Sequence, residues 1–153
     1  MSKQPMGRII FPEPFEKVEL AFPYKSTAEG VQLRHIDEED IAAFASAALL
    51  TPDKYAGEEI ELSCENLTAR EIADTIARVA GCDDIKFRRR APEETEEFRA
   101  REPSQIFLLW ASRQDLCLDG RAFQEKYGIH LTTFEEYVRW EKETFLSLIP
   151  AGK

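Results

Sequence analysis

Four consecutive carboxylates, Asp37, Glu38, Glu39 and Asp40, form the most closely spaced group of residues that could bind a metal ion or transfer a proton. A Ca²⁺ or Mg²⁺ site needs oxygen ligands arranged around one point, as in D-x-D-x-D-G loops, and this run lacks that spacing. Asp37 stands where a helix N-cap is expected, and the other three acids then fall in the first helical turn. Because backbone N–H groups and the macrodipole favour anions there, the cluster is predicted to begin a helix.

The histidines and cysteines are the next residues with metal-binding or nucleophilic chemistry. They are His35, His130, Cys64, Cys82 and Cys117. Neither histidine stands at a ligand spacing from another histidine or from a cysteine, and the cysteines match neither CxxC nor a zinc-finger pattern. His35 falls on a predicted strand, where a structural role is commoner than that of a base. We therefore expect no metal site, and reduced, half-buried cysteines.

Cofactor motifs are missing from the whole sequence. The glycines stand at 7, 30, 57, 81, 120, 128 and 152, so neither GxGxxG nor GxxxxGK can be formed. The four tyrosines are followed four residues later by Ala28, Glu59, Leu131 and Glu141, which leaves no YxxxK pair for proton transfer. We therefore expect no catalytic residue and no cofactor-binding residue in this chain, and no stand-alone hydride transfer.

Composition and charge exclude several classes of protein. The chain has 153 residues, 43% of them hydrophobic, which suits one folded domain. A net charge of -9 opposes binding to nucleic acids, because that binding needs Lys and Arg at the phosphates. Apolar runs such as 106–111 are too short to span a bilayer, and the first residues contain no sustained apolar stretch of the secretory type. A cytoplasmic location is predicted.

Two regions differ in their pattern. Residues 1–30 contain Pro5, Pro12, Pro14 and Pro23 and are predicted to be an extended lead-in, because proline fixes φ and disfavours helix before it. Residues 31–153 are predicted to form an α/β domain with a few short strands and about five helices. Its expected strands are 31–36, 59–64 and 84–90, each of which alternates apolar and polar residues or follows a turn.

Helix signals are strongest at the ends of the helices. Capping boxes are predicted at Thr68 with Glu71 and at Thr133 with Glu136, and Gly81 is expected to close the first of these helices. Further helices are expected at 91–102, at 103–112 and from Arg121 to Tyr127, and Gly128 should end the third of these. One continuous helix is expected over 134–149. The helix after the acid cluster should stop before Pro52. Its predicted inner face is Ile41, Phe44, Ala45, Ala48 and Leu49.

The order of these segments resembles the C-terminal half of NmrA-like proteins, which are atypical members of the short-chain dehydrogenase/reductase superfamily. The resemblance runs from about Val31 to Phe145 and includes a D-I-A element that starts a helix beside the family's substrate cleft. A second motif, G…I.L…LT..EIA..I….G, returns the chain to the nucleotide-binding sheet. The residues that match these motifs are Asp40, Ile41, Ala42, Gly57, Ile60, Leu62, Leu67, Thr68, Glu71, Ile72, Ala73, Ile76 and Gly81.

The resemblance implies a partial NAD(P)-binding Rossmann-like fold. Family members resemble reductases that bind NADP(H), or act as redox-responsive regulators that sense the dinucleotide and bind protein partners. The family's nucleotide-binding half, with its glycine-rich turn, should precede Met1. We therefore expect the substrate-side half of such a protein, at 31–153, with NADP(H) implied only for a full-length member and a missing N-terminal half as one partner.

Two other functions stay open at this point. One is an interaction module or a homo-oligomer, because a surface left by an absent half would be apolar and would expose strand edges. The other is a small independent enzyme with a substrate pocket near Tyr24, Phe107 and Trp110. Those aromatic residues at helical spacing are more often part of a core, so the NmrA-like interpretation is favoured, with the interaction module second.

Overall fold

A computed structural model describes residues 15–16, 19–20, 30–81, 86–87, 91–101, 110 and 116–148. In chain order its elements are β1 (Phe15–Glu16), β2 (Glu19–Leu20), β3 (Gln32–His35), α2 (Glu38–Leu50), α3 (Pro52–Tyr55), β4 (Glu65–Thr68), α4 (Ala69–Ala80), β5 (Lys86–Phe87), α5 (Pro92–Arg101), α7 (Gly120–Tyr127), α8 (Phe134–Trp140) and α9 (Lys142–Leu148). The predicted α/β class is confirmed, and the arrangement is consistent with a partial Rossmann-like fold.

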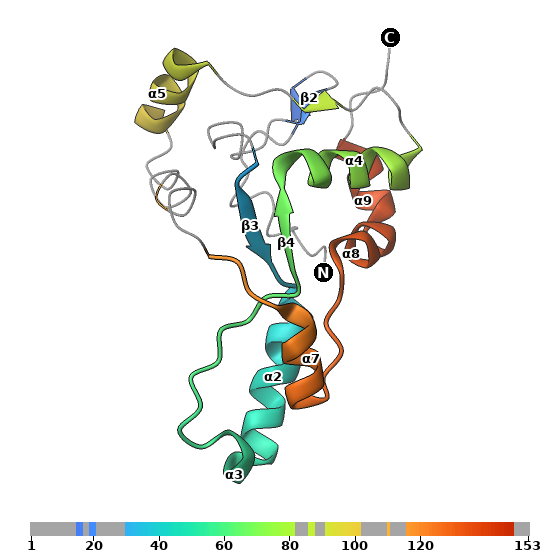
Figure 1. Ribbon diagram of the computed structural model, residues 1–153. Helices are drawn as coiled ribbons and strands as arrows, with labels where there is room; N and C mark the ends of the chain where they lie inside the picture. The colour runs from blue at the N-terminus through green and yellow to red at the C-terminus, as the bar shows by residue number, and fades with distance from the viewer. Residues whose placement is uncertain are drawn as a thin grey trace.

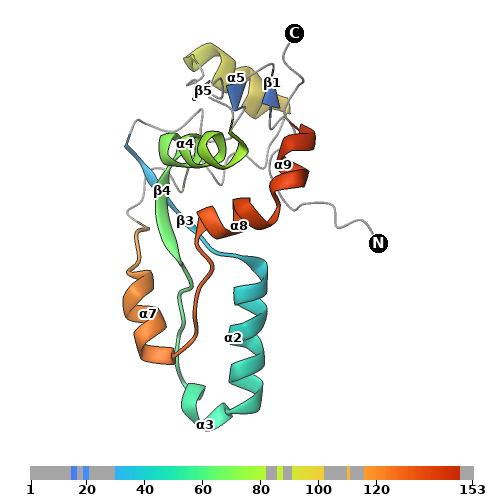
Figure 2. The same cartoon turned by 90° about the vertical axis from the view of Figure 1, so that its right-hand side faces the viewer.

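The described elements form two lobes (Figures 1 and 2). A sheet lobe contains β3, β4, α4, α8 and α9, and a helical lobe contains α2, α3 and α7. Each lobe has its own cluster of buried apolar side chains. β3 leads directly into α2, so the two lobes share a continuous backbone.

β3 and β4 pair as antiparallel strands at the centre of the sheet lobe. Gln32 lies opposite Thr68 and His35 opposite Glu65. Leu33 and Leu67 therefore point to one face, where α4 and α8 cover them. A second, three-stranded sheet has the order β1-β2-β5, with β5 parallel to β2, so the predicted third strand is confirmed at residues 86–87.

α4 forms as its end signals predict. Glu71 N donates to Thr68 Oγ1 at 3.2 Å, and Thr68 N donates to Glu71 Oε2 at 2.8 Å, which completes the capping box. Gly81 ends the helix with φ 69°, a left-handed conformation that favours glycine. Ile72 and Ile76 are fully buried and form the centre of the sheet-lobe core.

The last helical segment differs from its prediction. The capping box at Thr133 and Glu136 is confirmed, but the expected single helix is divided at Glu141 into α8 and α9. At this break α9 changes direction relative to α8 (Figure 2), and Phe145 meets Tyr137 edge-on with ring centroids 6.1 Å apart. α4 packs against both helices, and Val138 is buried between them and the sheet.

The helical lobe is closed by aromatic side chains. Phe44 of α2, Tyr55 of α3 and Tyr127 of α7 are buried together with Leu131. Tyr55 and Tyr127 stack with centroids 5.5 Å apart and an interplanar angle of 12°. Gly128 ends α7 with φ 69°, as its sequence position predicts.

The predicted strand at 59–64 is wrong. Residues 58–63 lie in no helix or strand, and the strand that pairs with β3 is Glu65–Thr68. Ile60 and Leu62 do share one side, as their alternation predicts, and this side packs against the helical-lobe core. Alternation of apolar and polar residues indicates only that one side of a segment is buried. In this segment helices, rather than a neighbouring strand, cover the apolar side.

The predicted inner face of α2 is correct only in part. Phe44 is buried and Ala48 packs beside it, but Ile41 is 45% exposed and Leu49 is 83% exposed. The inner face is instead Asp40, Phe44, Ala47 and Ala48. Because α2 is apolar around most of its circumference, its sequence does not select one buried face.

Three further predictions concern segments that the structure describes to different extents. α5 is confirmed as a helix with exposed charges, among them Glu93, Glu96 and Glu97. The extended lead-in at 1–30 and the helix at 103–112 lie largely outside the described residues. Within the described part of the chain, no helix is both long and apolar enough to cross a membrane.

Candidate functional site

The structure describes only one member of the predicted aromatic pocket. Tyr24 and Phe107 lie outside the described residues. Trp110 is described, and its side chain is 51% exposed. The grouping of these residues as a substrate pocket therefore stays a prediction.

Titratable side chains gather instead where the two lobes meet. We call this place the lobe junction and define it by His35, Asp40, Cys64, Glu65 and Thr132. These residues come from β3, α2, the approach to β4, β4 itself and the segment before α8. In Figures 1 and 2 the same elements converge between the sheet lobe and the helical lobe.

Asp40 is a buried carboxylate that binds the opposite side of the junction. Thr132 N donates to Asp40 Oδ2 at 2.7 Å, and Thr132 Oγ1 donates to Asp40 Oδ1 at 3.2 Å. Asp37 is the N-cap, as predicted, and accepts from Glu39 N at 2.7 Å. The acid cluster therefore has two roles, because its first residue caps α2 and its last ties α2 to the chain before α8.

Side chains of β4 make two further ties across the sequence. Glu65 Oε2 accepts from Phe134 N at 2.7 Å, in the first turn of α8, where backbone N–H groups favour an anion. Asn66 exchanges two hydrogen bonds with the backbone of Leu118, donating to its oxygen at 2.7 Å and accepting from its nitrogen at 3.1 Å. The Asn66 amide thus pairs with this segment as a strand backbone would.

His35 is a neutral side chain at neutral pH. Burial lowers its pKa to about 4, and its ring lies 5.7 Å from that of Phe134. An efficient general base has a pKa near the working pH. His35 is therefore suited to the packing of the junction rather than to proton abstraction.

Cys64 is a protonated thiol in this environment. Burial, together with the charges of Glu65 and Asp40, raises its pKa to about 11. Its Sγ donates to Leu131 O at 3.7 Å, and its backbone N donates to His35 O at 2.8 Å. Because the thiolate is the nucleophilic form of cysteine, Cys64 is not activated for attack.

The chemistry of the lobe junction is therefore that of a structural connection. Its carboxylates accept hydrogen bonds from backbone N–H groups, its histidine is a weak base, and its cysteine is protonated. In the described ranges, no group of three or more His, Cys, Asp or Glu side chains is placed to hold a metal ion. These residues join the two lobes, and their protonation states and contacts are not suited to nucleophilic catalysis.

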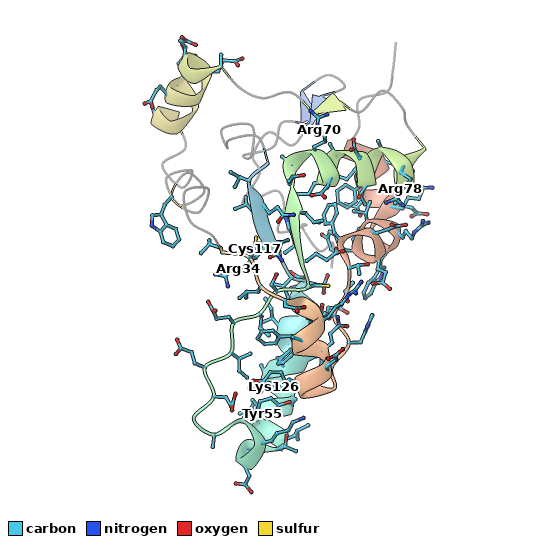
Figure 3. All side chains as sticks on the ribbon, viewed as in Figure 1. Arg34, Tyr55, Arg70, Arg78, Cys117 and Lys126 are labelled. Atoms are coloured by element: carbon cyan, nitrogen blue, oxygen red, sulfur yellow. The ribbon has the colours of Figure 1, made fainter. Side chains whose placement is uncertain are left out.

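A second polar cluster closes the far end of the helical lobe. Lys126 Nζ lies 2.6 Å from Glu58 Oε2, and Tyr127 OH donates to the same oxygen at 3.0 Å. Hydrogen bonds from Lys126 and Tyr127 hold the pKa of Glu58 below its usual range. Lys54 Nζ donates to Tyr127 O at 2.9 Å. Figure 3 shows Lys126 of this cluster, with Tyr55 of the aromatic core nearby. The cluster fastens α3 and its following loop to α7.

A third cluster joins α4 to α8. Arg78 NH1 lies 2.7 Å from Glu135 Oε1, and Arg139 Nε donates to the same oxygen at 3.0 Å. The two guanidinium groups lower the pKa of Glu135 to about 2. The side chains of Arg78 and Arg139 are more than half exposed and that of Glu135 is 36% exposed, so the cluster orients the helices with little stabilisation. Figure 3 shows Arg78 on the α4 side of this contact.

The sequence did not predict the hydrogen-bond partners of these clusters. One pattern in the sequence does indicate that Asp40 has a buried partner. Asp40 stands four residues before Phe44, so helical spacing places both on the same, inner face of α2. A carboxylate on a buried face requires a partner, which Thr132 supplies. Glu58 and Lys126 are 68 positions apart, and no local pattern links them.

Comparison with models of protein families identifies a match over the first part of the chain. The model of the NmrA-like family matches residues 4–97, which is more than half of the chain. The predicted resemblance began at Val31 and ended at Phe145, so 31–97 is common to both, and residues 98–145 lie outside the match. No curated protein matches the sequence. From the extent of the family match, the chain belongs to the NmrA-like family.

Proposed function

We propose that this chain is the substrate-side part of an NAD(P)-linked NmrA-like protein, either a reductase or a redox-sensing regulator, and that it is not catalytic alone. Membership of the NmrA-like family supports the NAD(P)-linked part of this proposal. The observation that carries the proposal is the family match combined with the absence of GxGxxG from all 153 residues. A dinucleotide pyrophosphate needs such a backbone turn at the start of a helix.

The chemistry of the lobe junction supports the non-catalytic part of the proposal. His35 has a pKa of about 4 and Cys64 a pKa of about 11, so neither is set for reaction at neutral pH. The role of the chain is then to shape the substrate side of a site whose phosphate-binding residues come from outside it. A cytoplasmic location remains a prediction from the sequence.

Calorimetric titration tests this function directly. NADPH is titrated into residues 1–153, with an NmrA-like protein that contains GxGxxG as the positive control. We expect no saturable heat from the chain under conditions in which the control binds. Saturable binding with a dissociation constant in the micromolar range would contradict the proposal, because the chain would then hold the dinucleotide by itself.

A second candidate function is protein interaction, and the surface favours it. Leu49 is 83% exposed, Leu50 is 81% exposed and Trp140 is 64% exposed. Leu49 and Leu50 are neighbours at the end of α2, whereas Trp140 ends α8. Large apolar side chains that are exposed together, as the two leucines are, are typical of an interaction surface. The chain would then be a regulatory module that binds a protein partner or a second copy.

A further inference from the structure

The side of α2 that faces away from the helical-lobe core is apolar along most of its length. Nine of its thirteen residues are exposed, and we call them the outer face of α2. They are Glu38, Glu39, Ile41, Ala42, Ala43, Ala45, Ser46, Leu49 and Leu50. After the first turn no residue of α2 carries a charge, whereas an exposed helix face is normally polar or charged.

The geometry of the helix places small residues in the middle of this face and large ones toward its ends. At about 100° per residue, Ala42, Ser46 and Leu49 lie opposite the buried Phe44 side. Ile41 and Leu50 lie on the two flanks of the same face. A second helix can therefore approach closely at the centre while larger side chains interlock at either end.

We propose that a second copy of this chain covers the outer face of α2, with the two α2 helices packed antiparallel about a twofold axis near residues 45 and 46. This inference rests on the interaction function proposed above and names the partner. In this arrangement Leu49 of each copy lies against Ala42 of the other. Ser46 lies close to its own counterpart. Such pairing is self-complementary and closes as a dimer.

The distribution of charge favours antiparallel pairing. Every exposed carboxylate of α2, Glu38 and Glu39, is in its first turn. Antiparallel packing separates the two acidic ends by roughly 20 Å at 1.5 Å per residue. This exceeds the screening length of about 8 Å at physiological salt. Antiparallel packing therefore keeps Glu38 and Glu39 of the two copies apart, whereas a parallel pair would bring them together.

The size of the face sets the strength of the contact. A standard stable interface uses roughly 20–30 residues from each partner. The outer face of α2 offers nine exposed residues, so α2 pairing alone is in the weak, reversible class. We therefore expect a monomer–dimer equilibrium that shifts with concentration.

Sedimentation equilibrium measures this equilibrium. Between roughly 1 and 200 µM, a range that brackets a micromolar constant, the average mass should rise from one copy toward two. Leu49→Lys should hold the chain as a monomer, because it places a charge opposite Ala42. Leu146→Lys is the matched control, since it makes the same change at an exposed leucine of α9, 42% exposed. This control should dimerise like the unmodified chain.

Cysteine cross-linking tests the geometry of the pair. In a Cys117→Ser background, Ser46→Cys should form a disulfide between copies under mild oxidation, because a disulfide needs Cα atoms within about 7 Å. Glu39→Cys should not, since its two copies would lie roughly 20 Å apart along the helices. The Cys117→Ser chain alone corrects for the remaining native cysteines.

The outcomes separate the competing conclusions. A monomer at every concentration would overturn the proposed second copy. A dimer that survives Leu49→Lys, or that is cross-linked through Glu39→Cys rather than Ser46→Cys, would overturn the α2 geometry while the interaction function stands. Both results leave the NADPH titration unaffected, so failure of this inference is distinct from failure of the reductase or redox-sensor function.

Discussion

Asp40 is the residue on which contact between the lobes depends most directly. Its carboxylate is buried and accepts two hydrogen bonds from Thr132, 92 positions away in the sequence. Asp40→Ala would leave the Thr132 N–H buried without an acceptor, and should lower the free energy of unfolding by about 2–3 kcal/mol. Urea denaturation measures this change.

Asp37→Ala is the matched control for Asp40. It removes an acid from the same turn, but this acid only caps α2 by accepting from Glu39 N. Loss of an N-cap should cost about 1 kcal/mol. Equal destabilisation by the two variants would mean that Asp40 acts only as another acid of the first turn.

His35 should give the stability a pH dependence of its own. Its pKa is about 4 in the folded chain, against 6.5 for a histidine exposed to water, so the unfolded chain binds a proton first as pH falls. Stability should therefore decrease from pH 6.5 toward pH 4, by at most about 1.4 kcal/mol per unit, and by less for a half-buried ring.

Comparison of two histidine variants isolates this effect. His35→Leu should remove the decrease between pH 6.5 and 5, above the range in which carboxylates lose their charge. His130→Gln should keep the decrease, because it alters a histidine whose side chain is 74% exposed. A decrease of the same size in all three chains, read by chemical denaturation at each pH, would assign it to other groups.

At the scale of the elements, local signals predicted where helices begin and end. The capping boxes at Thr68 and Thr133 and the closing Gly81 and Gly128 depend on neighbours within a few residues, and all four are confirmed. These hydrogen bonds and backbone conformations form without reference to the rest of the fold, which is why the sequence alone identifies them.

The buried faces and the strand pairing depend on distant residues and were only partly predictable. Nothing near residues 59–64 shows that helices rather than a strand cover Ile60 and Leu62. The orientation of α2 is fixed by Asp40 and Thr132, which are far apart in sequence. The predicted aromatic pocket is untested, and the lobe junction emerged only from the structure.

Gly120, the first residue of α7, is a close-packing position rather than a turn glycine. A Cβ at this position would overlap the backbone oxygen of Cys64 and lie 2.8 Å from that of Ser63. Both obstacles are backbone atoms and cannot rotate away. Gly120→Ala should therefore separate α7 from the approach to β4 and cost at least about 3 kcal/mol, or prevent folding.

Gly128→Ala, at the opposite end of α7, is the matched variant. Gly128 has φ 69°, but a Cβ there meets no atom within 4 Å. Only the strain of a left-handed alanine remains, which costs about 1–2 kcal/mol. Thermal unfolding followed by circular dichroism compares the two. A milder effect of Gly120→Ala than of Gly128→Ala would show that α7 can shift without loss.

At the scale of the whole molecule, two separate cores predict two levels of stability. Among the residues that the structure describes, the helical-lobe core has four buried apolar residues, and the sheet-lobe core has seven. Local opening is easiest where few apolar contacts hold a segment. We therefore expect amides of α7 to exchange with solvent at a lower free energy than those of α4.

Native-state hydrogen exchange on two core variants tests this division. Phe44→Leu leaves a space in the helical-lobe core and should speed exchange in α7 but not in α4. Ile76→Val makes a comparable loss in the sheet-lobe core and should act mainly on α4, each by about 1 kcal/mol. If either variant speeds exchange equally in both helices, the lobes unfold as one unit. The ties through Asp40 and Glu65 would then be strong enough to make the two cores cooperative.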